Sequence, residues 1–346
     1  MKSIRWKYSK PSADVQDEAL SIARQDSRLQ KIVSDTTLSL KKNPPRQNCA
    51  LCSLSLHSAQ NIKHRDLLFR HCSNCGHVQS FNSVTEDYEK LVSESLGYEE
   101  IYPDLSVLEY ESRCDRIYEP KKKWLFECLR AIEIDPIKLR WCDVGCGSGM
   151  FLKALQNAGV HELKGFDVNP HNLKIAEKFI GAGSIGRNQS GVENVFNIHD
   201  ADIYTSFFVL EHVEEIHRTI DALSKKRSGT MLAFAVPVFG LITMFESIVE
   251  SHYPRCLDAM LHTQIFTEES ISFFLNECGY KILSEWHFGQ DAVDFYRFIS
   301  GNIENLYPDD FQDELLKKLR SLVDPIQNIV DRGHLSDSRH ILAVKI

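Results

Sequence analysis

The sequence has no excess of positive charge, no leader-like start and no repeated or low-complexity tract. Its 40 lysines and arginines are outnumbered by 48 aspartates and glutamates, for a formal net charge of −8. This balance argues against a nucleic-acid partner, because general nucleic-acid binders carry a basic face. The first twenty residues are polar throughout, so we predict no secretory signal peptide. We therefore expect a cytoplasmic protein.

Long apolar runs are also scarce. The stretch 228–245, SGTMLAFAVPVFGLITMF, is uncharged and near the lower length limit for a membrane span. It contains Pro237 and two glycines, and its first half is rich in β-forming residues. We interpret it as a buried parallel strand followed by a loop, and expect no membrane partner. The ten cysteines, without a secretory signal, favour metal binding or burial over disulfides.

Composition shifts divide the chain into four parts. We predict a polar N-terminal segment and linker over 1–48, a cysteine-rich module over 49–83, a helical connector over 84–138 and a large domain over 139–346. A helical insert at about 294–335 precedes the last strand of that domain. Strands are expected near 139–144, 163–167, 182–187, 202–208, 230–236, 281–288 and 338–346, with 192–198 competing for the third. The alternation predicts an α/β fold with a doubly wound, mostly parallel, seven-stranded sheet.

The segment LRWCDVGCGSGMFL (139–152) predicts a strand, a glycine loop and a helix. A dinucleotide-binding loop needs a glycine where Met150 stands, and no Gly-Lys-Ser/Thr follows for a phosphate loop. Asp143 at the strand end would repel a pyrophosphate and suits a cationic ligand. Asp167, eighteen residues after Gly149, can accept hydrogen bonds from both ribose hydroxyls of an adenosine. A ligand with a ribose, a positive charge and no phosphate is S-adenosylmethionine.

Three motifs in order resemble those of class I S-adenosylmethionine-dependent methyltransferases. They are DVGCGSG (143–149), GFDVNP (165–170) and DIYTSFFVLEH (202–212), and the resemblance covers about 139–290 plus the final strand. It implies a Rossmann-like fold in which the glycine loop approaches the methionine part of the cofactor, with Asp143 near the amino group. It also implies that Asp167 holds the ribose. The implied cofactor-binding residues are Asp143, Gly145, Cys146, Gly147, Gly149, Asp167, Val168, Asn169, Phe208 and Leu210.

Two C-x-x-C pairs separated by nineteen residues are typical of a zinc site. The expected ligands are Cys49, Cys52, Cys72 and Cys75. Four thiolates fill the coordination shell and leave no position for water or substrate, so we predict a structural zinc. The flanking His71 and His77 are interpreted as exposed side chains.

The layout of a cysteine module, a helical connector and a methyltransferase core resembles the nucleotide-linked deoxysugar C-methyltransferases and their relatives. Those enzymes use a Tyr-x-Glu-His run beside the cofactor, and the matching run here is Val209-Leu210-Glu211-His212. The tyrosine is absent, and only about sixty residues follow the sixth strand, where that group has a large sugar-binding domain. Both departures weaken C-methylation in particular and leave O- or N-methylation of a sugar-like acceptor open.

A methyl acceptor that loses a proton needs a base within hydrogen-bond reach. His212 is the best candidate because it follows the strand that faces the cofactor, with Glu211 as its orienting partner; a purely structural role for the pair stays open. The loop after the fifth strand is the expected place for acceptor binding. Its polar candidates are His252, Tyr253, Arg255, His262 and Gln264, with Arg255 suited to a phosphate.

We therefore predict methyl transfer from S-adenosylmethionine to a small polar acceptor, a sugar or nucleotide-linked sugar. One alternative is an RNA methyltransferase whose zinc module reads structured RNA. A second is a protein that binds the cofactor without catalysis. The sequence does not predict the oligomeric state.

Overall fold

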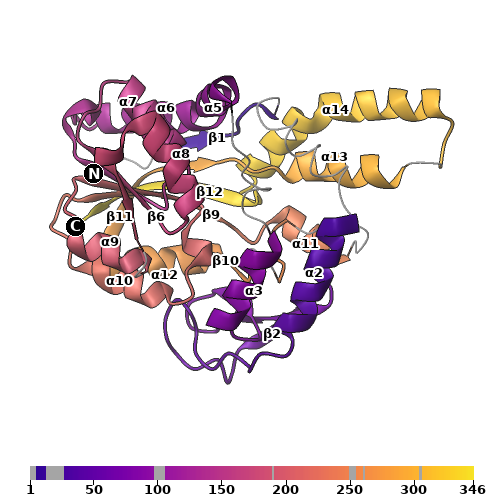
Figure 1. Cartoon of the computed structure of the whole chain (residues 1–346). Coiled ribbons are helices and arrows are strands. Elements are labelled where there is room, and N and C mark those ends of the chain that lie inside the picture. The colour runs from indigo at the N-terminus through magenta and orange to yellow at the C-terminus, as the bar shows by residue number, and fades with distance from the viewer. Residues whose placement is uncertain are drawn as a thin grey trace.

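A central sheet organises the larger part of the chain (Figure 1). The computed structural model describes residues 5–12, 27–96, 106–188, 191–248, 255–259, 262–303 and 306–346. Within them, eight strands lie in the order β1-β11-β12-β9-β8-β5-β6-β7. Their bounds are β1 (Arg5–Tyr8), β5 (Trp141–Val144), β6 (Leu163–Asp167), β7 (Ile185–Arg187), β8 (Ile203–Phe207), β9 (Met231–Pro237), β11 (Tyr280–His287) and β12 (Ser338–Lys345).

The sheet is parallel except for β12, which runs antiparallel to β11 and to β9. Each of the seven strands expected from the sequence is present, so the predicted doubly wound, mostly parallel fold is confirmed. The segment 192–198 that competed for the third strand is a helix. The eighth strand, β1, was not predicted: Arg5 pairs with Ser284 at the sheet edge, far away in the sequence.

Helices cover both faces of the sheet (Figure 1). On one face, α6 and α7 pack with Trp141, Ile203 and Leu342, while α9, α10 and α12 pack on the other with Cys142, Tyr204 and other strand residues. Neighbouring residues of one strand thus enter opposite cores, as strand alternation requires. The helices of these layers are α6 (Glu119–Arg130), α7 (Met150–Asn157), α8 (Pro170–Ile180), α9 (Val192–Ile198), α10 (Ile216–Ser224) and α12 (Glu268–Cys278).

The apolar stretch 228–245 forms the interior of the sheet. β9 lies between β8 and β12 with all seven residues buried, and the chain then enters α11 (Leu241–Ile248). The expected buried strand is present, whereas the expected loop after it is wrong from Leu241 onward, because α11 begins there. Among the described residues, no helix is long and apolar enough to cross a bilayer.

The remaining helices lie outside these two layers (Figure 1). The connector contains α3 (Glu86–Leu96), α5 (Val107–Arg113) and the π-helical turn η2 (Cys114–Tyr118), which runs into α6. The insert before the last strand is a hairpin of α13 (Asp291–Asn302) and α14 (Asp309–Arg332), which projects from the body (Figure 1). Short 3-10 turns complete the chain: η3 (Pro136–Lys138), η4 (Ala182–Ser184) and η5 (Leu210–His212).

A second, four-stranded antiparallel sheet lies beside α11 and belongs to the cysteine module. Its order is β10-β4-β3-β2, with bounds β2 (Gln60–His64), β3 (Leu67–His71), β4 (Val78–Ser80) and β10 (Gln264–Ile265), and α2 (Ser27–Leu40) packs nearby against α3. β10 follows β9 in the chain, so the larger domain supplies an edge strand of the smaller sheet. The two sheets are therefore joined by backbone pairing.

Gln264 on β10 is the buried polar link at this junction. Its Nε2 donates to the Val213 carbonyl at 2.7 Å, and its Oε1 lies 3.0 Å from His77 Nε2. Val213 immediately follows η5, so the amide connects the cysteine module to the segment behind β8.

We predict that Gln264→Ala lowers the free energy of unfolding by about 1–3 kcal/mol, since buried donors and acceptors lose their partners. Urea denaturation followed by circular dichroism measures it. Gln60→Ala, at an exposed position of β2, is the control and should change stability by less than about 0.5 kcal/mol. Equal stability of the two variants would contradict the assignment.

Candidate functional site

The predicted cofactor residues gather where parallel strands end. Asp143 on β5 pairs in register with Gly165 of β6 and with Thr205 of β8. The carboxyl ends of these three strands therefore meet at one edge, at the centre of the sheet. In open α/β sheets this edge is where ligands bind.

Asp143 is a buried carboxylate at that edge, only 4% exposed. Its Oδ1 accepts a hydrogen bond from Thr205 Oγ1 at 2.5 Å. Burial raises the pKa of Asp143 to about 7, while the Thr205 hydrogen bond opposes the shift. A positively charged ligand group would favour the ionised carboxylate here.

The glycine loop adopts backbone angles that side chains resist. Gly145 and Gly149 both have φ of 77°, and Gly147 has φ of 52°. A Cβ at Gly145 would lie 2.3 Å from a methyl carbon of Val209, whereas a Cβ at Gly147 would meet nothing within 4 Å. Gly145 thus permits close packing against the segment after β8, and Gly147 borders open space.

Asp167 ends β6 on the other side of the loop. Its Oδ2 accepts from the Gly147 amide at 2.8 Å, and its Oδ1 accepts from the Asn169 amide at 2.9 Å. Burial raises the pKa of Asp167, and these amide donors oppose the shift. A carboxylate offers about four acceptor positions, so two hydroxyls can still bind. Val168 is 60% exposed beside it, and Asn169 caps α8.

Lys121 on α6 is a buried lysine that no sequence motif pointed to. It is 5% exposed, and its Nζ lies 5.0 Å from the ring centre of Phe207 and 5.1 Å from those of Tyr118 and Phe208. Burial lowers the pKa of Lys121 to about 7, and the charge of nearby Asp143 acts in the opposite direction. In the sequence it stands in a run of three lysines, which looks like a solvated helix face.

The connector contacts the glycine loop through Tyr110 of α5. The Tyr110 hydroxyl donates to the Ser148 carbonyl at 3.0 Å, and its ring stacks on Phe179 with 3.7 Å between the ring centroids. Tyr110 is fully buried. The connector is thereby fixed against the loop.

Glu211 and His212, the predicted catalytic pair, lie in η5 directly after β8. Glu211 is fully buried, and burial raises its pKa to about 8. His212 is partly exposed and its Nε2 lies 4.0 Å from Glu211 Oε1. The His212 ring stacks with that of His262 at a centroid distance of 5.4 Å. Glu211, His212 and His262 are called the polar cluster below.

The other predicted residues have diverse surroundings. Leu210 is buried in the main core, Cys146 packs beside Gly165, and Phe208 adopts φ of 57°. The Arg255 guanidinium is held by Asp294 and Asp337, so a phosphate would have to displace a carboxylate. Gln264 is buried at the junction described above. His252 and Tyr253 lie outside the described residues.

The four predicted zinc ligands form one cluster. The sulfurs of Cys49 and Cys75 are 3.6 Å apart, those of Cys52 and Cys72 are 3.7 Å apart, and all four lie within 4.8 Å of one another. Zinc–sulfur bonds of about 2.3 Å in a tetrahedron place sulfurs about 3.8 Å apart. The cluster therefore fits a zinc ion without a free coordination position.

His77, expected to be exposed, is fully buried and 3.0 Å from Gln264 Oε1. The expectation was wrong because β10, distant in sequence, covers it. The cysteine cluster itself belongs to the same hydrophobic core as Phe266 and Leu210. A zinc ion held by the cluster would therefore be coupled to the core behind η5.

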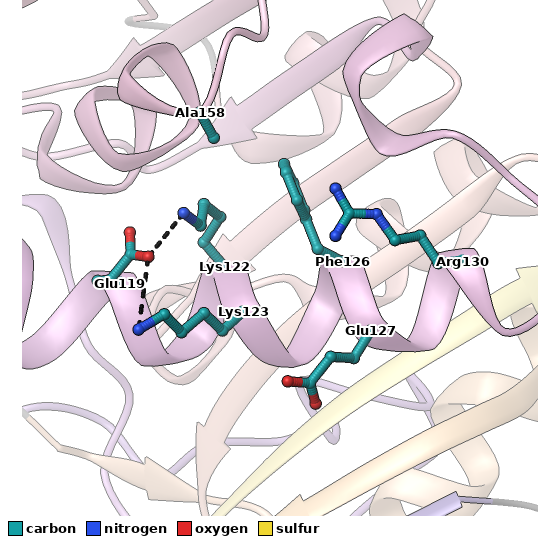
Figure 2. A pocket seen from close by; sticks show the side chains of 7 residues that line it. All are labelled: Glu119, Lys122, Lys123, Phe126, Glu127, Arg130 and Ala158. Atoms are coloured by element: carbon teal, nitrogen blue, oxygen red, sulfur yellow. Dashed lines mark hydrogen bonds and ion pairs between the residues drawn. The ribbon is translucent and has the colours of Figure 1, made fainter.

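A separate hollow lies along α6 (Figure 2). Glu119 pairs there with Lys122 at 2.7 Å and with Lys123 at 3.9 Å. The other lining residues are Phe126, Glu127, Arg130 and Ala158. None of the predicted site residues lines it, and two of its lysines are engaged with Glu119.

A family model described as a methyltransferase domain matches residues 116–285 of the chain. No curated protein matches the chain. Among solved structures, magnesium protoporphyrin IX methyltransferase from Synechocystis PCC 6803 with bound SAH is 16% identical, covering 73% of this chain and 96% of its own, with a TM-score of 0.44. An S-adenosylmethionine-dependent methyltransferase from Mesorhizobium loti is 16% identical, covering 64% and 97%, with a TM-score of 0.39.

We predict that the purified chain contains one zinc per molecule and that Cys72→Ser loses it. The variant should also melt at a lower temperature, because zinc binding contributes directly to folding and the cluster lies in the main core. Elemental analysis and thermal melting measure the two effects. Cys128→Ser, a buried cysteine outside the cluster, should keep its zinc. Full zinc content in Cys72→Ser would overturn the assignment.

Proposed function

The chain carries a class I S-adenosylmethionine-dependent methyltransferase domain, and from this premise we propose that its methyl acceptor is a sugar or nucleotide-linked sugar. The supporting observation is the polar cluster, which stands beside the glycine loop and against the cysteine module. Val209 packs on Gly145, and Gln264 ties the module to Val213, so the cluster lies between the two. Such a group of polar side chains suits a small hydroxyl-rich acceptor.

The cofactor fits the residues at the strand ends. Asp143 would meet the amino group of S-adenosylmethionine, Asp167 the ribose hydroxyls, and the backbone from Gly145 to Gly149 the methionine chain, with Val168 beside the adenine. The open space over Gly147 leaves room for this approach. When bound, S-adenosylmethionine supplies a methyl group that is already electrophilic on its sulfonium.

Lys121 would bind the carboxylate of the cofactor's methionine. Its ammonium group is buried close enough to Asp143 for each charge to act on the other. The amino and carboxylate groups of one amino acid also lie close together. A buried acid and a buried base at one strand end therefore match the two charges of the methionine moiety.

On the acceptor side, we assign proton removal to His212 with Glu211 behind it. His212 is partly exposed while Glu211 is fully buried, so the histidine can reach an acceptor and the carboxylate can stabilise its charged form. The His262 ring stacks on that of His212, so it borders the space proposed for the acceptor. The reaction needs positioning and exclusion of water more than covalent catalysis.

Contacts of the basic side chains favour this acceptor over RNA. Arg46 pairs with Glu214, and Arg70 donates to the Arg46 carbonyl at 2.9 Å while covering the Phe81 ring. These two arginines, one in the cysteine module and one just before it, thus serve contacts within the chain. Because these arginines are engaged within the chain and the net charge is −8, fewer cationic side chains are left to bind a phosphate backbone.

The proposed cofactor site is tested by calorimetry with S-adenosylhomocysteine. We expect binding to the full chain and at least tenfold weaker binding to Asp167→Asn, because a neutral amide accepts less strongly from the ribose hydroxyls. Asp135→Asn, at an exposed turn, is the matched control and should bind normally. Tight binding of a dinucleotide instead would refute the site.

The acceptor is tested with methyl-labelled S-adenosylmethionine, offering the chain a panel of nucleoside-diphosphate sugars and, separately, structured RNA. Label in the sugar fraction supports the proposal. Label in RNA alone, weakening steeply with added salt, would establish the other acceptor class.

For Lys121→Met we expect about tenfold or greater loss of affinity for S-adenosylmethionine at pH 6.5, where the lysine is charged. The magnitude follows from losing one charge-assisted hydrogen bond of about 1.5–3 kcal/mol. Calorimetry provides the measurement. Lys123→Met removes a well-exposed charge from the same helix and should bind as the unmodified chain does. Equal affinities of all three proteins would remove Lys121 from the site.

A further inference from the structure

The polar cluster brings together three side chains that can each bind a metal ion. The carboxylate of Glu211 and one ring nitrogen each of His212 and His262 all lie within 4.8 Å of one another. Two come from η5, and the third comes from the loop before β10. The cluster is separate from the cysteines, whose sulfurs form their own group.

Among the described residues, the Glu211 carboxylate is compensated only by its 4.0 Å approach to His212 Nε2. It is fully buried, and neither of its oxygens has a hydrogen-bond partner among the described residues. Burying an ionised carboxylate without compensation costs several kcal/mol. A bound cation provides that compensation, and the nearest cation-binding atoms are the histidine nitrogens.

The hydrogen bond of His262 fixes which of its ring nitrogens is available to a metal. Its Nδ1 lies 2.7 Å from the Arg255 carbonyl oxygen, which can only accept, so Nδ1 carries the proton. The lone pair therefore resides on Nε2. A histidine that ligates a metal through one nitrogen commonly donates from the other to a carbonyl or carboxylate. Asp258 fixes the loop by accepting from the His262 amide at 3.1 Å.

The separations suit one ion. Metal–ligand bonds of about 2.0–2.2 Å place neighbouring ligand atoms roughly 3–4 Å apart. His212 Nε2 and Glu211 Oε1 are 4.0 Å apart, and the remaining pairs need movements of less than about an ångström. Three protein ligands leave coordination positions open, and the partly exposed His212 marks the side from which an acceptor would enter.

We propose that Glu211, His212 and His262 bind one divalent transition-metal cation in addition to the zinc of the cysteine cluster. Two imidazoles and one carboxylate suit divalent first-row transition metals such as Mn²⁺, Fe²⁺ and Zn²⁺. The cation would hold an acceptor oxygen, a role that rests on the proposed function. With the cation bound, His212 is a ligand and no longer the base: an acceptor hydroxyl held by the cation would release its proton to water, because the metal stabilises the resulting oxyanion.

The test uses the full chain with zinc in its cysteines and Mn²⁺ as the probe, followed by electron paramagnetic resonance. Mn²⁺ prefers oxygen and nitrogen ligands over thiolates, so the cysteine cluster should not compete for it. We expect one Mn²⁺ per chain, with affinity at least tenfold lower in Glu211→Gln and in His262→Asn. His161→Asn, which changes an exposed histidine between α7 and β6, should bind Mn²⁺ normally.

Zinc content and circular dichroism establish that each variant is folded, and having two independent variants covers the failure of one. No Mn²⁺ binding by the full chain, or unchanged affinity in both cluster variants, would overturn the proposal. Labelled-methyl transfer to a sugar by a chain whose only metal is the zinc of the cysteine cluster would refute the role of the second cation in the reaction and leave the acceptor class standing. Mn²⁺ binding without transfer to any sugar would instead refute the acceptor class.

Discussion

The close approach of Val209 to Gly145 is the constraint on which the site depends. A Cβ at Gly145 would lie 2.3 Å from Val209, so the loop after β5 and the segment after β8 can meet only because that position is a glycine. Asp143 and Thr205 lie on the two strands that lead into this contact and are hydrogen-bonded to each other. Glu211 and His212 follow Val209 in η5. The packing of the Val209 side chain on the Gly145 backbone therefore sets the distance between the cofactor residues and the acceptor residues.

The cysteine module is part of the same arrangement. β10 pairs with β4, Gln264 bridges His77 to Val213, and the Thr267 hydroxyl donates to the Gly76 carbonyl at 3.1 Å. Since the cysteines share a hydrophobic core with Leu210, a metal in the cluster stabilises the segment that carries Glu211 and His212. A zinc ion with no open position can thus affect catalysis without touching substrate.

Local patterns predicted much of this structure. Apolar segments that alternate with helical segments predicted the strands of the sheet. Two C-x-x-C pairs predicted the cysteine cluster. The missed features depend on distant segments. β1 pairs with a strand nearly the whole chain away, His77 is covered by β10, and Lys121 is buried by packing of α6 over Phe207 and Phe208. Arg255 looked available for a phosphate because Asp294 and Asp337 approach it only in the folded chain.

The most direct test of this arrangement is a crystal structure of the zinc-loaded chain with S-adenosylhomocysteine. The account predicts ribose hydroxyls on the Asp167 carboxylate, the homocysteine amino group at Asp143, and the sulfur facing the side where Glu211 and His212 stand. An adenosine bound away from the ends of β5 and β6, or a sulfur directed away from η5, would contradict it.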